Sequence, residues 1–247
     1  MTGRPVDVAA VVVPVHNEAE LLDRCLTALT VAVETAARRG IRCQVQVVLD
    51  ACTDASAAIA ANHPFPTLVV SEATVGQARA RGVQAALTAI GELPAERVWL
   101  ANTDADSAVP PNWIVAQCDL AAEGADVFVG TVRPDFADLG RAHRHHWLHT
   151  HVRGAPNGHV HGASLGLRAS VYRAAGGFDA IPEHEDVQLV ARARALGAIV
   201  QASDEAEVLT SGRFVGRTPG GYAGYLREQA RMLAAHVEPP ESSAALA

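Results

Sequence analysis

The feature that most restricts the fold is the run from Val8 to Val15, which consists only of valine, alanine and proline. Its length and its β-branched side chains are typical of a strand buried on both faces. A helix is expected directly after it, from Glu18 to Arg39, with Asn17 as its candidate N-cap. The apolar residues of this helix repeat at helical spacing: Leu22, Leu26, Leu29 and Val33. A buried strand followed at once by an amphipathic helix predicts an α/β fold.

The same alternation continues through the first half of the chain. Further strands are expected at 44–49, 67–70 and 97–101, with an alanine-rich helix at 76–90. This order predicts a mostly parallel central sheet flanked by helices, with right-handed crossovers. Ligands of such sheets bind beyond the carboxyl ends of the strands, where Asn17, Asp50 and Asp104 fall.

The second half of the chain is less regular. Strands are expected at 126–130, 162–167 and 208–210, and helices at 141–152, 187–196 and 220–236. The sequence has neither an internal repeat nor a long linker, so we expect a single domain.

Composition and charge exclude several classes of function. The 247 residues carry a formal net charge of −7, whereas wholesale binding to nucleic acid or anionic lipid needs an excess of basic residues. The four cysteines are scattered, without the spacing of a zinc site or a disulfide framework, which fits a reducing cytoplasm. No apolar run is long enough to span a bilayer. We therefore expect a cytoplasmic protein without a transmembrane segment, and a peripheral position at the inner face of the membrane stays open.

Two carboxylates follow the strand expected at 97–101. Residues two apart in an extended segment point the same way, so Asp104 and Asp106 should converge at the end of that strand. A divalent cation relieves their repulsion, and hard oxygen ligands suit Mg²⁺ or Mn²⁺ shared with a substrate diphosphate. The alternative is a pair of solvated loop acids.

Two further acidic positions each allow two interpretations. Glu185 and Asp186 precede a helical stretch, where they could favour the helix dipole. Alternatively, Asp186 could act as a general base that deprotonates an acceptor hydroxyl. Asp50 could accept a hydrogen bond from a nucleobase or ribose, or could cap the next helix as Thr53 and Asp54 could.

Several motifs in a fixed order resemble those of glycosyltransferase family 2, over about residues 8–221. In order, the motifs are Pro14 to Glu18 (PVHNE), Val47 to Asp54 (VVLDACTD), Gly76 to Gly82 (GQARARG), Asp104 to Asp106 (DAD), His161 to Gly166 (HGASLG) with Gly176 to Asp179 (GGFD), and Glu185-Asp186 with Arg192. The chain departs from the family pattern at three positions. Leu49 replaces an acid, His16 replaces a common aromatic residue, and Ser164 stands where asparagine is frequent.

The resemblance implies a GT-A fold in one domain over residues 1–236. Its donor-binding half would be 1–109, its acceptor and catalytic half 110–236, and 237–247 would be a disordered tail. The implied reaction is inverting transfer of a sugar from a nucleoside-diphosphate sugar to an acceptor hydroxyl, without a covalent enzyme intermediate. The acceptor stays open between a lipid phosphate, a glycan, a small metabolite and a protein.

The resemblance also implies roles for single residues. Asp186 would be the general base, with Glu185 beside it. Asp104 and Asp106 would hold Mn²⁺ or Mg²⁺, which neutralises charge on the departing nucleoside diphosphate. The donor would be bound by Pro14, Val15, Asn17, Glu18, Asp50, Arg79 and Asp104. The acceptor side would include His161, Gly162 and Ala163.

Histidines are concentrated in one stretch, with seven of the eleven between His143 and His161. His145 and His149 are one helical turn apart and could bind zinc. However, the glutamate of an H-E-x-x-H motif is missing. The alternative is an exposed helix over the acceptor cleft.

Arg213 and Arg217 lie in a glycine-containing segment after the strand expected at 208–210. They could clamp the diphosphate, because guanidinium groups pair well with phosphate oxygens. A loop that closes over the donor would need such glycines as hinges. A solvated basic turn is the alternative, and Tyr222 and Tyr225 are expected to be packing residues of the last helix.

Two other functions compete with sugar transfer. A nucleotidyltransferase would carry a lysine-containing glycine- and arginine-rich loop after the first strand, but lysine is absent from the sequence. A catalytically silent module that binds sugar nucleotides would not need Asp104, Asp106 and Asp186 together.

Overall fold

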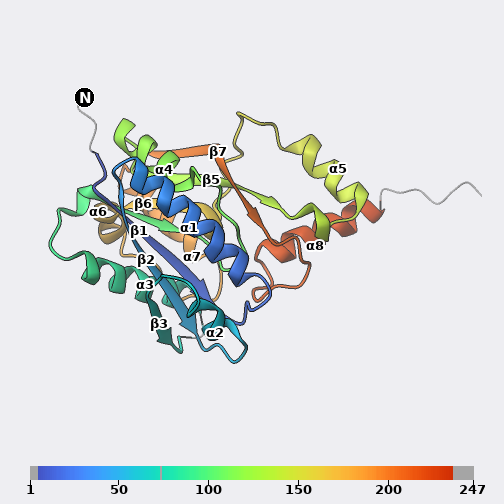
Figure 1. Cartoon of the computed structure of the whole chain (residues 1–247). Coiled ribbons are helices and arrows are strands. Elements are labelled where there is room, and N and C mark those ends of the chain that lie inside the picture. Colours follow the sequence, from blue (N-terminus) through green and yellow to red (C-terminus); the bar gives the residue numbers. More distant parts are fainter. Residues whose placement is uncertain (1–4, 73, 236–247) are drawn as a thin grey trace, which may run out of the picture.

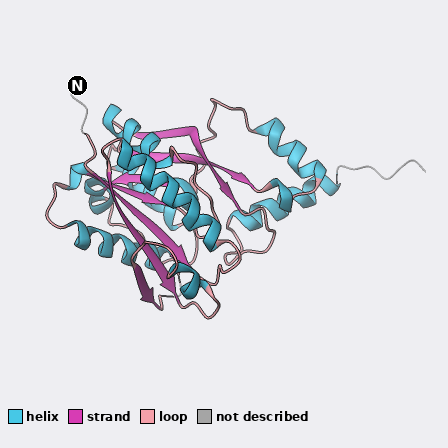
Figure 2. Ribbon diagram, viewed as in Figure 1, coloured by secondary structure: helices cyan, strands magenta, loops and turns pink. Residues whose placement is uncertain are grey.

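The predicted opening strand is β1 (Val8–Val15), and all of its residues are buried. The structure is a computed structural model and describes residues 5–72 and 74–235. Within them, a sheet of seven strands has the order β3-β2-β1-β4-β6-β5-β7 (Figure 2). The other strands are β2 (Arg42–Asp50), β3 (Thr67–Val70), β4 (Val98–Asn102), β5 (Val127–Pro134), β6 (Leu165–Arg168) and β7 (Val200–Thr210).

Most neighbouring strands of this sheet are parallel. β1 pairs in parallel with β2 and β4, β2 with β3, and β5 with β7. β6 is antiparallel to both of its neighbours, β4 and β5. The prediction of a mostly parallel α/β sheet is therefore confirmed.

Helices cover both faces of the sheet (Figure 1). One face carries α1 (Leu22–Arg38), α2 (Ser56–Ala60) and α4 (Trp113–Glu123). The other carries α3 (Val75–Ile90), α6 (Ala169–Ala174) and α7 (Glu185–Ala195). The 3-10 turns are η1 (Ala95–Arg97), η2 (Phe136–Asp138) and η3 (Gly162–Ser164).

Two helices lie together at one end of the molecule, away from the centre of the sheet (Figure 1). They are α5 (Arg141–Thr150) and α8 (Tyr222–Ala235). His143 on α5 and Gln229 on α8 are joined by a buried hydrogen bond of 3.0 Å. The ring of His143 also stacks on Phe214, with centroids 5.9 Å apart.

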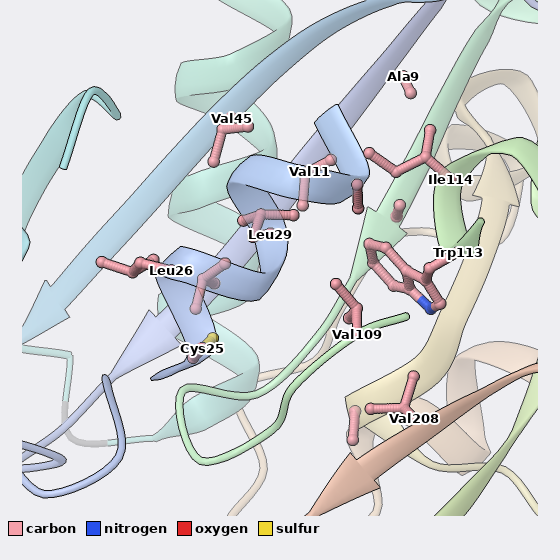
Figure 3. Packing of buried hydrophobic residues seen from close by; sticks show 14 of the residues in the cluster. Ala9, Val11, Cys25, Leu26, Leu29, Val45, Val109, Trp113, Ile114 and Val208 are labelled. Carbon is pink, nitrogen blue, oxygen red and sulfur yellow. The ribbon is translucent and has the colours of Figure 1, made fainter. Parts of the chain in front are cut away.

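The core follows from the alternation of side chains along β1. Val11 belongs to the apolar cluster that includes α1 and α4, whereas Val12 belongs to the cluster under α3 and α7. Figure 3 shows Leu26 and Leu29 of α1 packed over β1. Each such buried aliphatic side chain contributes about 1.5–3 kcal/mol relative to exposure, so the sheet is a rigid base for the loops at its edge.

The start of the first helix was predicted wrongly. α1 begins at Leu22, and its N-cap is Leu21, which makes no side-chain capping bond. Asn17 instead has a φ of 54°, and its Oδ1 accepts a hydrogen bond of 2.7 Å from the Thr53 N–H. Asparagine is one of the few residues that adopt the left-handed region readily, so Asn17 ties the loop after β1 to the loop after β2.

Other elements also differ from the expectation, since the short helices α2 and α6 were not predicted. α4 was not predicted, because most of its residues are buried and its apolar pattern has no clear helical period. β7 begins at Val200, before the expected 208–210, because acids interrupt its apolar pattern. The predicted tail at 237–247 and residue 236 of the predicted last helix lie outside the described residues. In the described part of the chain, the structure contains no helix both long and apolar enough to cross a bilayer.

Candidate active site

A cavity of about 560 Å³ lies where β1, β2 and β4 end. This is the position expected for the ligands of such a sheet. Asn17 is absent from the cavity wall. The other predicted site residues all line the cavity: Pro14, Val15, Glu18, Asp50, Arg79, Asp104, Asp106, His161, Gly162, Ala163, Glu185, Asp186, Arg213 and Arg217.

The two carboxylates after β4 are held by arginines from different parts of the chain. Asp104 forms an ion pair with Arg79 of α3. Asp106 Oδ2 is 3.1 Å from Arg213 Nη2, and its Oδ1 accepts a 3.1 Å hydrogen bond from Ser107. Burial raises the pKa of Asp106 to about 6, and the charge of Asp104 adds to this effect while Arg213 opposes it. Negative charge is therefore crowded at this point, as the sequence pattern predicted.

A divalent cation fits this donor set. The site offers carboxylate oxygens of two crowded acids, which are ligands that Mg²⁺ and Mn²⁺ prefer. The described residues contain no group of three or more histidine, cysteine or acidic side chains arranged to hold a metal. A cation bound here would therefore need further oxygen ligands from a substrate or from water.

Arg79 forms the buried support of the site. Its side chain is 3% exposed and forms ion pairs with both Asp104 and Glu185. Burial by itself would lower the pKa of Arg79, but the charges of Asp104 and Glu185 outweigh it and raise that pKa. Gly162 lies directly against this guanidinium, and a Cβ at that position would overlap it. The close approach of Arg79 therefore requires glycine at position 162, the first glycine of the HGASLG motif.

Glu185 and Asp186 occupy different environments although they are adjacent. Both lie in the first turn of α7, so the helix-dipole interpretation applies to each. Glu185 is 3% exposed, and burial raises its pKa although Arg79 opposes the shift. Asp186 lines the cavity and accepts a 2.8 Å hydrogen bond from the Val187 N–H. The geometry leaves Asp186 as the accessible acid of the pair.

Asp50 ends β2 at the bottom of the cavity and is 1% exposed. Its Oδ1 accepts a 2.8 Å hydrogen bond from the Glu72 N–H, and its Oδ2 lies 3.3 Å from Arg217 Nη2. The N-cap of α2 is Ala55, which makes no side-chain capping bond, and Asp54 accepts a 2.9 Å hydrogen bond from the Ser56 N–H. Asp50 therefore does not cap this helix, and its role toward a nucleoside stays a prediction.

The segment after β7 brings two arginines into the cavity. Arg213 binds Glu18 through both guanidinium nitrogens, at 2.9 and 2.6 Å. This hydrogen bonding and the charge of Asp106 raise the pKa of Arg213 even though burial opposes the shift. Arg217 reaches Asp50. Both arginines are thus paired with acids while their side chains stay 40% and 37% exposed, and the diphosphate clamp stays a prediction.

Most of the histidine cluster lies away from the cavity. His145 and His149 are exposed on α5, with ring centroids 4.1 Å apart. No third ligand joins them among the described residues. His161 does line the cavity, and burial lowers its pKa to about 4 although the charge of Asp186 acts in the opposite direction.

Many residues of the cavity wall were not predicted as site residues, among them His16, His159, Glu183, His184, Tyr222 and Tyr225. His16 Nδ1 lies 2.7 Å from the Asp50 carbonyl oxygen. Tyr222 was expected to pack within the last helix, but its ring lies edge-on to His161 with centroids 5.5 Å apart. The sequence signals for these positions were the place of His16 within the PVHNE motif and the nearness of Glu183 and His184 to Glu185 and Asp186.

Several solved structures share this fold at low sequence identity. TarS 1–349 of S. aureus is 15% identical with a TM-score of 0.59, and the match covers 92% of this chain and 64% of that chain. The mannosyltransferase PcManGT of Pyrobaculum calidifontis, in complex with GDP-Man and Mn²⁺, is 17% identical with a TM-score of 0.59, covering 94% and 66%. The mannosyl-3-phosphoglycerate synthase of Rubrobacter xylanophilus is 16% identical with a TM-score of 0.53, covering 92% and 71%. The chain thus spans about two thirds of these proteins, and the likeness confirms the GT-A fold.

Sequence comparison identifies the family. None of the curated proteins matches the chain. The profile described as "Glycosyl transferase family 2" matches residues 10–174, which is more than half of the 247 residues. The matched region contains β1, the Asp104–Asp106 pair and the HGASLG motif. The chain therefore belongs to glycosyl transferase family 2.

Proposed function

We propose that this protein transfers a sugar from a nucleoside-diphosphate sugar to an acceptor hydroxyl, with inversion at the anomeric carbon. One observation carries the proposal: a single cavity brings together Asp50, the pair Asp104 and Asp106, and Asp186. These are acids suited to three different tasks, which are nucleoside binding, support of the leaving group and proton removal.

In this proposal the two halves of the sequence bind different substrates. Residues 1–109 bind the donor, and residues 110–236 supply the acceptor side and the base. The exception is the segment with Arg213 and Arg217, which returns to the donor side through Glu18 and Asp50. Pro14 and Val15 contribute the end of β1 to the same wall, whereas Asn17 supports it through the loop after β2.

Asp104 and Asp106 would hold Mn²⁺ or Mg²⁺, which when bound neutralises charge on the diphosphate leaving group. The raised pKa of Asp106 supports this role, because a nearby cation would relieve the crowding of negative charge. Arg213 and Arg217 are placed to pair with phosphate oxygens once those oxygens compete for them. PcManGT was solved with GDP-Man and Mn²⁺, which is consistent with this donor and metal class.

Asp186 acts as the general base in this proposal. It accepts the proton of the acceptor hydroxyl while that oxygen forms a bond to the anomeric carbon and the bond to the diphosphate breaks. Glu185 cannot easily share this task, because it is buried and paired with Arg79. Its role is to anchor the first turn of α7 and thereby to position Asp186.

Calorimetric titration with a panel of nucleoside diphosphates, with and without Mn²⁺, tests the donor site. We expect at least one nucleoside diphosphate to bind, and Mn²⁺ to strengthen its binding. The Asp106→Asn variant should lose the effect of Mn²⁺. Binding that is indifferent to Mn²⁺ would contradict the metal assignment. Normal binding without either hydrolysis or transfer of any sugar nucleotide would favour the catalytically silent module.

A further inference from the structure

The arginines of the cavity are concentrated around the donor site. Among the described lining residues, Arg79, Arg213 and Arg217 carry the guanidinium groups. Arg79 pairs with Asp104 and Glu185, Arg213 with Glu18 and Asp106, and Arg217 with Asp50. Each of the three arginines therefore forms ion pairs with acids of the proposed nucleotide and metal sites or with Glu185.

Another part of the cavity wall carries the aromatic side chains of two tyrosines and two histidines. Tyr222 lies edge-on to His161, with centroids 5.5 Å apart, and Tyr225 stacks on Tyr222 at 5.9 Å. His159 is edge-on to His161 at 6.3 Å. All four rings line the cavity. Burial lowers the pKa of His161 and the charge of Asp186 opposes this shift, because Asp186, the proposed base, lies near this ring.

Among the described residues, the guanidinium nearest to His161 belongs to Arg79, which lies against Gly162 and is already paired with Asp104 and Glu185. Burial lowers the pKa of His161 to about 4, so its imidazole is neutral at physiological pH. The acids facing the same space are Asp186 and Glu183. Arg133, whose charge reaches Tyr222, is itself paired with Glu207 at 2.9 Å. A phosphate beside these rings would meet carboxylates without a free guanidinium, which is unfavourable in a partly desolvated site.

We propose that the acceptor is an uncharged saccharide whose ring packs on Tyr222 and Tyr225, beside His159 and His161. The inference rests on the proposed transferase function and narrows its acceptor class. Tyrosine rings offer an apolar face and a polar tip, which suits a ligand that has both C–H faces and hydroxyl groups. The neutral imidazole of His161 can both donate and accept hydrogen bonds with such hydroxyls. The same wall disfavours a lipid phosphate or a phosphorylated small molecule.

Matched acceptors test the substrate class. The enzyme is saturated with the nucleoside diphosphate and Mn²⁺, and saturation-transfer NMR measures the binding of methyl glycosides and disaccharides against glucose 6-phosphate, 3-phosphoglycerate and farnesyl phosphate. We expect at least one neutral saccharide to bind more tightly than every phosphorylated compound. Preference for a phosphorylated compound, or failure of every saccharide to bind, would overturn the inference. Nucleoside-diphosphate binding in the same samples shows whether the proposed function itself stands.

Variants of the ring wall test the location. Tyr222→Ala should weaken saccharide binding about two- to tenfold, because the sugar loses its contact with the aromatic ring, while Tyr222→Phe should keep most of the affinity. Met232→Ala provides a matched control on the same helix, because Met232 is 50% exposed and lies outside the cavity wall. The affinity for the nucleoside diphosphate should stay unchanged in all three variants. Tyr222→Ala alone should lower the melting temperature, because Tyr222 packs against the core, so saccharide binding is measured well below that temperature. Saccharide binding that is unaffected by Tyr222→Ala would place the acceptor elsewhere.

Discussion

The two walls of the cavity hold their charged groups in different ways. The wall formed by α3 and the start of α7, here called the buried wall, carries Arg79, Glu185 and Asp186. The wall formed by residues 211–217, here called the loop wall, carries Arg213 and Arg217. Arg79 is 3% exposed, whereas Arg213 and Arg217 are 40% and 37% exposed.

This difference in burial suggests a difference in task. An ion pair under the protein surface is costly to separate, because an unpaired charge would remain in a poorly solvated place. In the loop-wall pairs the guanidinium ends are half-exposed, so water can solvate an arginine that leaves its more buried carboxylate partner. The buried wall is therefore suited to hold the base in a fixed geometry, and the loop wall to exchange its carboxylate partners for the phosphates of an arriving donor.

The largest effect is expected from the base on the buried wall. Asp186→Asn should reduce turnover about 10²- to 10⁴-fold, which is the usual contribution of general-base catalysis. The affinity for the nucleoside diphosphate should not change. Initial rates and calorimetry measure the two quantities. Glu183→Gln is the control, because Glu183 lines the same cavity three residues earlier, and an equal loss in that variant would remove the special role of Asp186.

The support of the buried wall should have the next largest effect. Arg79→Leu leaves Glu185 buried without its partner, and breaking a buried ion pair in this way costs about 3–5 kcal/mol. Urea unfolding measures the free energy of unfolding. The matched change on the loop wall, Arg213→Leu, should cost less than the Arg79 change, because the guanidinium of Arg213 is 40% exposed and its partners Glu18 and Asp106 keep some contact with solvent. If both variants lost the same stability, the two walls would not differ as the structure indicates.

Arg213 should matter for ligand binding instead of stability. Arg213→Ala removes a charge-assisted contact with the diphosphate, so the Kd for the nucleoside diphosphate should rise about tenfold or more. Arg231→Ala serves as the control, because Arg231 is 70% exposed on α8. If the affinity were unchanged in Arg213→Ala, Arg213 would pair with Glu18 and Asp106 but would not contact the diphosphate.

The last effect concerns the pH dependence of stability. The pKa of Asp106 is raised in the folded state, from 3.8 to about 6. Its contribution to stability is therefore present below pH 3.8 and is lost as the pH rises through about 6. The lowered pKa of His161 works in the opposite direction, since its contribution is present above pH 6.5 and is lost as the pH falls through about 4.

Because the pKa shifts of Asp106 and His161 act in opposite directions, the contribution of Asp106 is measured by comparing a variant with the wild type. The stability of Asp106→Asn relative to the wild type should increase as the pH rises from about 4 to about 7 in metal-free buffer. Urea unfolding at several pH values measures this difference. A difference that stays constant over the range would mean that Asp106 ionises normally.

The sequence by itself determined the sheet and the acids at its edge. The valine run of β1 can be buried only on both faces, and the helix after it must then cross to a parallel strand, so Asp50 and Asp104 had to end at one edge. The two-residue spacing of Asp104 and Asp106 was likewise enough to predict that their carboxylates converge. These predictions needed only neighbouring residues and the periodicity of strands and helices.

The tertiary structure decided which distant side chains complete the site. Arg79 and Glu185 are 106 residues apart and Glu18 and Arg213 are 195 apart, and no periodic pattern relates such positions. The left-handed backbone of Asn17, the requirement for glycine at 162 and the placing of Tyr222 on the cavity wall likewise depend on what packs against them. The reason is physical: strand and helix patterns record which face of an element is buried, but they do not record which residue lies on the other side of the contact.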